Sequence, residues 1–133
     1  MNGAVEAGFA AVIRAAMPGI DVREATSTKS LPANIQLVVV ECPEVEHVVG
    51  PLHRATVKAF LGTPAFDMSE AQHRDATGAL ALALLDPAAA KLIFDPAAGT
   101  LALAGFHVRS QSEEVVENTW RSTVELVAGI RLG

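Results

Sequence analysis

The sequence predicts an α+β fold: a mostly antiparallel sheet of four to five strands, with two main helices packed on one face. Apolar residues recur at helical spacing near the N-terminus, whereas residues 52–61 and 120–132 show a period of two, with mostly apolar residues on one face and mostly polar residues on the other. Two strand-like segments are linked as a hairpin, and no βαβ repeat with glycine-rich turns occurs. Because 133 residues usually build one core, we expect a single domain over residues 1–133.

Residues 1–17 are predicted to form an amphipathic helix. Asn2 is a plausible N-cap, and Pro18-Gly19 stops the helix. The weak alternation of Ile20 and Val22 then predicts a short strand within residues 20–25. Apolar side chains share one face of the helix at Val5, Phe9, Val12, Ile13, Ala16 and Met17.

A β-hairpin is predicted next. Residues 35–41 are rich in β-branched side chains and indicate a buried strand, which Pro43 ends or bends. Gly50-Pro51 is a turn signal, and the alternation after it indicates a half-exposed strand. Residues 38–49 and 52–61 therefore predict a long hairpin that projects beyond the sheet.

The second half of the chain contains one more helix and two more strands. Ser69 and Gln72 match a capping box that opens a helix through about Leu85. Residues 86–99 contain Asp-Pro-Ala-Ala twice, which indicates two turns or helix starts rather than a structural repeat. Strands are predicted over residues 100–109 and 120–132, and a polar connection over residues 110–118 separates them.

Composition excludes several classes of protein. The chain is 50% hydrophobic and 19% charged, which is too apolar for a disordered chain. Its net charge of −5 argues against a nucleic-acid-binding protein, because such proteins need clustered Lys and Arg. No targeting segment and no apolar run long enough to span a bilayer is visible, so the cytoplasm is the default compartment.

No catalytic constellation stands out in the sequence. Cys42 as the single cysteine excludes an internal disulfide, and its acidic neighbours raise rather than lower a thiol pKa. His47 and His53 flank the Gly50-Pro51 turn and could approach each other, but solvated histidines are the simpler interpretation. Nucleophile elbows, phosphate-binding loops and zinc spacings do not occur. We expect no catalytic residue, cofactor or metal; a small enzyme using His47, His53 and Cys42 is the less favoured alternative.

The C-terminal strand carries the segment Trp120-Arg121-Ser122-Thr123-Val124-Glu125-Leu126-Val127-Ala128-Gly129-Ile130. The chain resembles the tail terminator or tail-completion (minor tail) proteins of long-tailed phages. The resemblance lies in this ending, in the order of the elements, in the length and in a second helix that contains His73. The resemblance implies a non-enzymatic structural protein that forms a homo-hexameric ring. Such a ring caps the tail tube, contacts the tail tube protein and the head–tail connector, and lies in the neck of a virion assembled in the host cytoplasm.

A ring of this kind suggests roles for the charged residues. Rings are heterologous assemblies, so basic and acidic surfaces that meet at each interface would set the register. We expect the subunit interface to use Glu41, Glu44 and Glu46 together with Arg54 and Lys58. Glu113, Glu114 and Glu117 are expected to line a channel that DNA passes without specific binding, because phosphate is repelled there. No contact with a membrane is expected, and a small oligomeric adaptor or binding domain is the alternative function.

Overall fold

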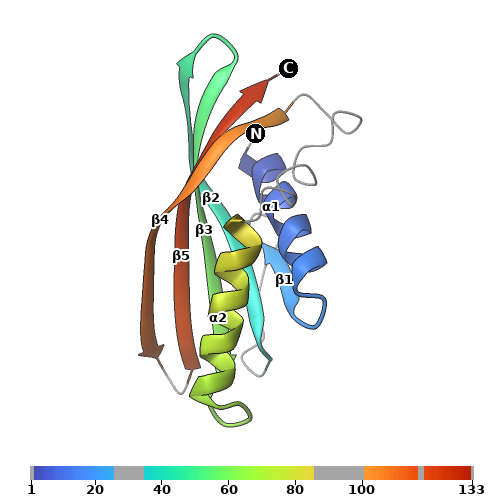
Figure 1. The fold of residues 1–133 in the computed structure, drawn as a ribbon, viewed down its shortest axis with the longest axis vertical. Helices are drawn as coiled ribbons and strands as arrows, with labels where there is room; N and C mark the ends of the chain where they lie inside the picture. Colours follow the sequence, from blue (N-terminus) through green and yellow to red (C-terminus); the bar gives the residue numbers. More distant parts are fainter. Residues whose placement is uncertain (1, 26–34, 86–100, 117–118, 133) are drawn as a thin grey trace.

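The computed structural model describes residues 2–25, 35–85, 101–116 and 119–132, which form an α+β fold with two helices and one five-stranded sheet (Figure 1). The expected fold class is therefore confirmed. In chain order the elements are α1 (Asn2–Ala16), β1 (Asp21–Glu24), β2 (Leu37–Val49), β3 (Leu52–Pro64), α2 (Glu70–Leu85), β4 (Leu101–Val116) and β5 (Thr119–Leu132).

The strand order in the sheet is β1-β2-β3-β5-β4. β1 pairs with β2 in parallel, and every other neighbouring pair is antiparallel. β5 lies between β3 and β4 and is paired on both sides along nearly its whole length. This position explains its prevailing alternation, because a strand with one face on the core alternates apolar and polar residues.

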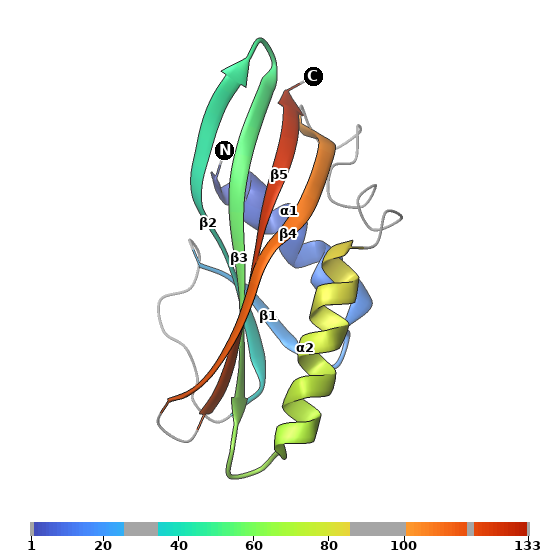
Figure 2. The same ribbon diagram turned by 60° about the vertical axis from the view of Figure 1, so that its left-hand side comes forward.

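Both helices lie on the same face of the sheet (Figure 2). The predicted apolar face of α1 is buried there except for Ala16, which is exposed at the end of the helix, and Phe9 and Ile13 are fully inaccessible to solvent. The sheet contributes the predicted inward positions of β3 and β5 to the same core. Those strand residues are Ala55, Val57, Ala59, Leu61, Val124, Leu126, Ala128 and Ile130.

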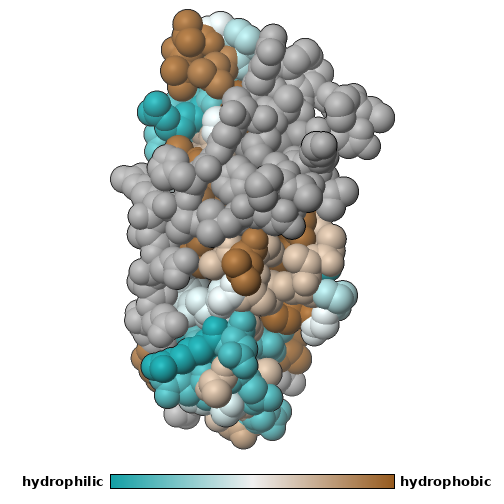
Figure 3. All heavy atoms as spheres, viewed as in Figure 1, coloured by the Kyte–Doolittle hydropathy of each residue, from teal (hydrophilic) through white to brown (hydrophobic). Residues whose placement is uncertain are grey.

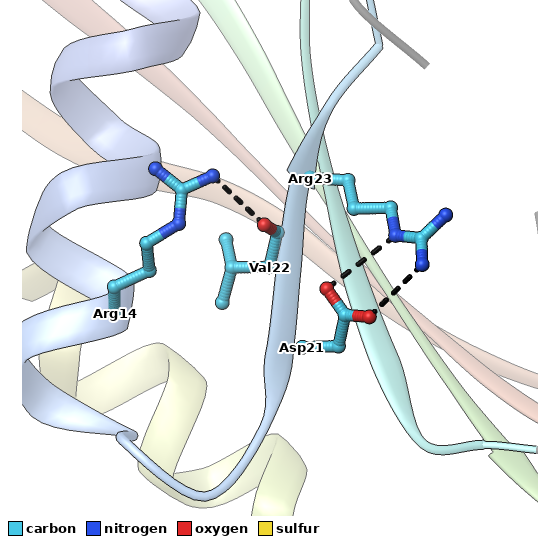
Figure 4. A network of polar contacts seen from close by, with 4 residues as sticks. All are labelled: Arg14, Asp21, Val22 and Arg23. Carbon is cyan, nitrogen blue, oxygen red and sulfur yellow. Dashed lines mark hydrogen bonds and ion pairs between the residues drawn. The ribbon is translucent and has the colours of Figure 1, made fainter. Parts of the chain in front are cut away.

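A polar contact joins α1 to the edge of the sheet (Figure 4). Arg14, in the last turn of the helix, donates from Nη2 to the carbonyl oxygen of Val22 in β1 at 2.8 Å. On the same strand, Asp21 and Arg23 form an ion pair with each other at 3.0 Å. The short strand predicted within residues 20–25 is thus confirmed, and the helix that precedes it is tied to its backbone.

Pro43 does not end β2, which continues to Val49. The pairing with β3 instead shifts by one residue between Glu41 and Glu44, where Pro43 lies. Since side chains alternate between faces, this shift changes which positions point inward. Before the shift Cys42 faces the helices, and after it Val45 and His47 share the face of their partners Ala55 and His53.

The hairpin of β2 and β3 turns at Gly50-Pro51, where Gly50 has a positive φ of 54°. A glycine at the first position of a two-residue turn suits the twist of the two strands, and other residues adopt that φ with strain. β3 remains paired with β5 as far as Leu52 with Arg131. Projection of the hairpin beyond the sheet therefore stays a prediction.

The polar segment after residue 109 is a strand rather than the expected connection. β4 extends to Val116 and pairs with β5 throughout, with Glu114 opposite Arg121. A strand on the edge of a sheet needs little apolar alternation, because backbone hydrogen bonds to its one neighbour hold it. The two Asp-Pro-Ala-Ala sequences and Glu117 lie outside the described residues.

Candidate assembly interface

The side of the sheet opposite α1 and α2 carries a mixed polar and apolar surface, which we call the outer sheet face. Its side chains come from the central strands β2, β3 and β5, and all are exposed or half-buried. Figure 2 shows both helices on the other side of the sheet. The face consists of Val39, Glu41, Glu44, Glu46, Arg54, Thr56, Lys58, Phe60, Arg121, Thr123, Glu125 and Val127.

All five residues predicted for the subunit interface lie on the outer sheet face. The register shift at Pro43 produces this arrangement, because it moves Glu44 and Glu46 to the side where Glu41 already lies. Within the chain, Glu41 is opposite Lys58, and Arg54 Nη1 is 2.9 Å from Glu46 Oε1. Part of the charge complementarity that we expected between subunits is therefore satisfied within one subunit.

The middle of the outer sheet face combines an aromatic ring with flanking charges. Phe60 is 37% exposed and pairs with Val39 on one side and Thr123 on the other. Two positions along β3, Lys58 lies between Glu41 and Glu125 of the neighbouring strands. An apolar centre with a charged surround is a typical composition for a surface that a protein partner covers.

The tip of the β2–β3 hairpin adds a second exposed apolar group. Val48 is 42% exposed and Val49 is 65% exposed. Figure 3 shows hydrophobic atoms gathered at this end of the molecule, with strongly hydrophilic atoms directly beside them. Exposed apolar side chains at a strand end favour aggregation of a monomer, and burial against another chain removes these side chains from water.

The two histidines at the hairpin tip lie close together, as their positions on either side of the turn allow. His47 and His53 are register partners, with ring centroids 5.1 Å apart and planes inclined by 61°. His47 Nε2 is 2.9 Å from the carbonyl oxygen of Gly50, and His53 Nδ1 is 3.2 Å from that of Pro51. The turn backbone therefore orients both rings.

Cys42 does not join the histidines. It is 2% exposed, and the five residue steps of strand from Cys42 to His47 span roughly 16 Å. Burial, and secondarily the carboxylate of Glu6, raise the pKa of its thiol to about 11. Glu6 Oε2 also accepts a hydrogen bond from the backbone N–H of Cys42 at 3.2 Å. The nucleophile–histidine set of the enzyme alternative is thus not assembled, and the thiol is in its unreactive form at neutral pH.

Sequence reasoning missed a buried polar cluster under α2. His73 is 2% exposed, with Nδ1 2.6 Å from Thr63 Oγ1 and Nε2 2.7 Å from Ser122 Oγ. Thr77 Oγ1 donates to the carbonyl oxygen of His73 at 2.9 Å and lies 3.0 Å from Ser122 Oγ, with which it shares a second hydrogen bond. The available signal was the serine at an inward position of β5, because a hydroxyl on a buried face requires a partner. Both ring nitrogens of His73 face hydroxyl groups, and the ring is buried from solvent. This histidine therefore connects α2 to β3 and β5 rather than binding a ligand.

Two of the three acidic residues predicted for a DNA channel, Glu113 and Glu114, lie on the edge strand β4, and Glu117 lies outside the described residues. Glu113 is opposite Ser122, and Glu114 is opposite Arg121. Within the described part of the chain, no group of three or more histidine, cysteine, aspartate or glutamate side chains is placed to hold a metal ion. No helix of the described residues has the length and apolar character needed to cross a membrane.

Comparison with known proteins establishes the fold. No protein-family model and no curated protein matches this chain. A solved structure, "Virion of native gene transfer agent (GTA) particle", contains a chain of similar fold with a TM-score of 0.62 and 19% identity. The match covers 91% of this chain and 85% of that chain. A second solved structure matches with a TM-score of 0.52 and 17% identity, covering 98% of this chain and 91% of the other.

Proposed function

We propose that this protein is a structural virion protein that caps the tail tube as a homo-hexameric ring and joins it to the head-side connector. The observation that carries the proposal is the fold, which is shared over 91% of the chain with a component of a virion particle. The phage tail terminator resemblance of the C-terminal segment supports the position at the end of the tail. In this role the protein acts by contacts with other chains, without catalysis.

The outer sheet face supplies the surface that such a ring requires. Arg54 and Glu46 already pair within the subunit. Glu44 is the most available acid for a neighbouring subunit, since it is exposed and its register partner Thr56 is uncharged. Lys58 is the corresponding base, half-buried beside Phe60. A contact of Lys58 or Glu44 with an oppositely charged residue on a different surface of the next subunit would set the register of the ring.

The acidic strand residues fit a channel that repels DNA. Six subunits with a net charge of −5 carry about −30 in total. We place Glu113, Glu114 and Glu117 at the lumen, where an acidic wall would keep passing DNA from adhering. Because two of these glutamates belong to an edge strand, that edge would face the DNA path. Charge reversal of all three should impair DNA delivery while assembly is retained.

Light scattering coupled to size exclusion tests the ring. Six subunits of 13.9 kDa give about 83 kDa, and we expect Lys58→Glu to shift this species toward monomer. Arg74→Glu, a reversal on the exposed surface of α2, is the control and should keep the mass of the unaltered protein. Loss of the ring in the control, or no loss in Lys58→Glu, would contradict this interface.

A further inference from the structure

We propose that His47 and His53 form a binding site for one divalent transition-metal ion, of the nitrogen-preferring class that includes Zn²⁺ and Cu²⁺. From the sequence we expected no metal, because no ligand spacing indicated one. The structure adds the relative placement and orientation of the two rings. The inference is independent of the proposed virion function, because it depends only on the hairpin tip.

The turn carbonyls determine which ring nitrogens are available. A carbonyl oxygen only accepts hydrogen bonds, so the nitrogen that faces it carries the proton in the neutral imidazole. The protonated nitrogens are therefore Nε2 of His47, facing Gly50, and Nδ1 of His53, facing Pro51. The opposite nitrogens, Nδ1 of His47 and Nε2 of His53, retain the lone pairs that bind metal. Histidine ligands of metals usually donate their other N–H to a carboxylate, a backbone carbonyl or water, as both rings do here.

The spacing of the rings fits a shared ion. Two imidazoles bound to one tetrahedral ion at metal–nitrogen distances near 2 Å have their ring centres about 5 Å apart. The centroids of His47 and His53 are 5.1 Å apart. Both residues are fixed on paired strands that a two-residue turn connects, so little conformational entropy is lost when the ion binds.

The site is accessible and has room for further ligands. His47 is exposed and His53 is half-buried at the end of the hairpin. Among the described residues no third metal-binding side chain completes a cluster, so water would occupy the remaining positions. Two protein ligands favour an ion that binds imidazole strongly, and Cu²⁺ exceeds Zn²⁺ in that respect.

Titration calorimetry with Cu²⁺ and with Zn²⁺ tests the site on the full chain. We expect one Cu²⁺ per chain, weaker binding of Zn²⁺, and a loss of about tenfold or more in affinity in His47→Ala and in His53→Ala. Arg54→Ala, which removes a neighbouring charge and leaves both rings, should bind as the unaltered protein does. Electron paramagnetic resonance of the Cu²⁺ complex should show two coordinated nitrogens, and one fewer in either histidine variant.

The same samples are used to check that the variants are folded. Circular dichroism should be unchanged by either histidine substitution at the hairpin tip. Zn²⁺ should raise the unfolding temperature of the unaltered protein and of Arg54→Ala, but not that of the two histidine variants. Unchanged Cu²⁺ affinity in both histidine variants would place the metal elsewhere and overturn the proposal. Absence of saturable binding by the unaltered protein would overturn it as well.

Discussion

Nε2 of His73 lies 2.7 Å from Ser122 Oγ, which joins the middle of the chain to its C-terminal strand beneath α2. The other ring nitrogen is 2.6 Å from Thr63 Oγ1 in β3. One buried side chain thus connects a helix to two adjacent strands. Hydrogen bonds of this kind fix the position of α2 more specifically than apolar contact does, because each donor needs its acceptor.

Replacing His73 should therefore destabilise the fold. In His73→Leu the hydroxyls of Thr63 and Ser122 lose the imidazole as a partner, at a cost of about 1–3 kcal/mol in the free energy of unfolding. Urea denaturation followed by circular dichroism measures the change. Arg74→Ala is the matched control on the exposed side of α2, where loss of the Glu70 ion pair costs less than about 1 kcal/mol. Equal losses in the two variants would show that the buried network contributes nothing.

The inward face of β5 should not accept a charge. Val124 is fully buried, so Val124→Asp places an unpaired carboxylate in the core and should prevent folding. The adjacent Thr123 lies on the outer sheet face, and Thr123→Asp should leave the domain folded. Expression in soluble form and the near-ultraviolet circular dichroism of each variant decide the matter. A soluble, natively folded Val124→Asp protein would refute the central position of this strand.

The buried thiol should make stability depend on pH in the alkaline range. The pKa of Cys42 is about 11 in the fold against 9.0 as its ordinary value, so the folded state holds the thiol proton more tightly. The associated stability is fully present below pH 9 and is lost as the pH rises from 9 toward 11. The urea midpoint should therefore fall more between pH 8 and pH 10.5 in the unaltered protein than in Cys42→Ala. An identical fall in both proteins would contradict this assignment.

The spacing of apolar residues in the sequence predicted those elements that have one face on the core and the other face away from it. The inward residues of α1, β3 and β5 follow from alternation because one layer of helices covers one face of the sheet. The capping box also forms, with Ser69 N–H donating to Gln72 Oε1 at 2.7 Å and Gln72 N–H donating to Ser69 Oγ at 3.2 Å. In these places the local signal and the tertiary environment favour the same conformation.

Local patterns failed where pairing with a distant strand decides the structure. The polar residues before Val116 suggested a connection, yet β5 supplies hydrogen-bonding partners along all of β4. Pro43 suggested an end or a bend of the strand, and a one-residue shift in register accommodates it within β2. The same shift gathers Glu41, Glu44 and Glu46 on one face, and no property of the isolated segment predicts that outcome.

The contacts of the candidate sites were predictable only in part. The approach of His47 to His53 follows from their positions around a short turn. The network around His73 joins residues that are 10 and 49 positions away in sequence, and such contacts exist only once the sheet has formed. The ion pair between Arg54 and Glu46 likewise depends on hairpin register. Its presence changes which charges remain for a partner.

Electron cryo-microscopy of particles released by cells that make this protein tests the central claim most directly. We expect six copies in a closed ring at the head-side end of a tail tube, with the outer sheet face of each subunit against a different surface of its neighbour. Density for the same fold elsewhere in the particle would contradict the terminator role. Purified, intact particles that lack the chain altogether would contradict the claim that it is a virion protein.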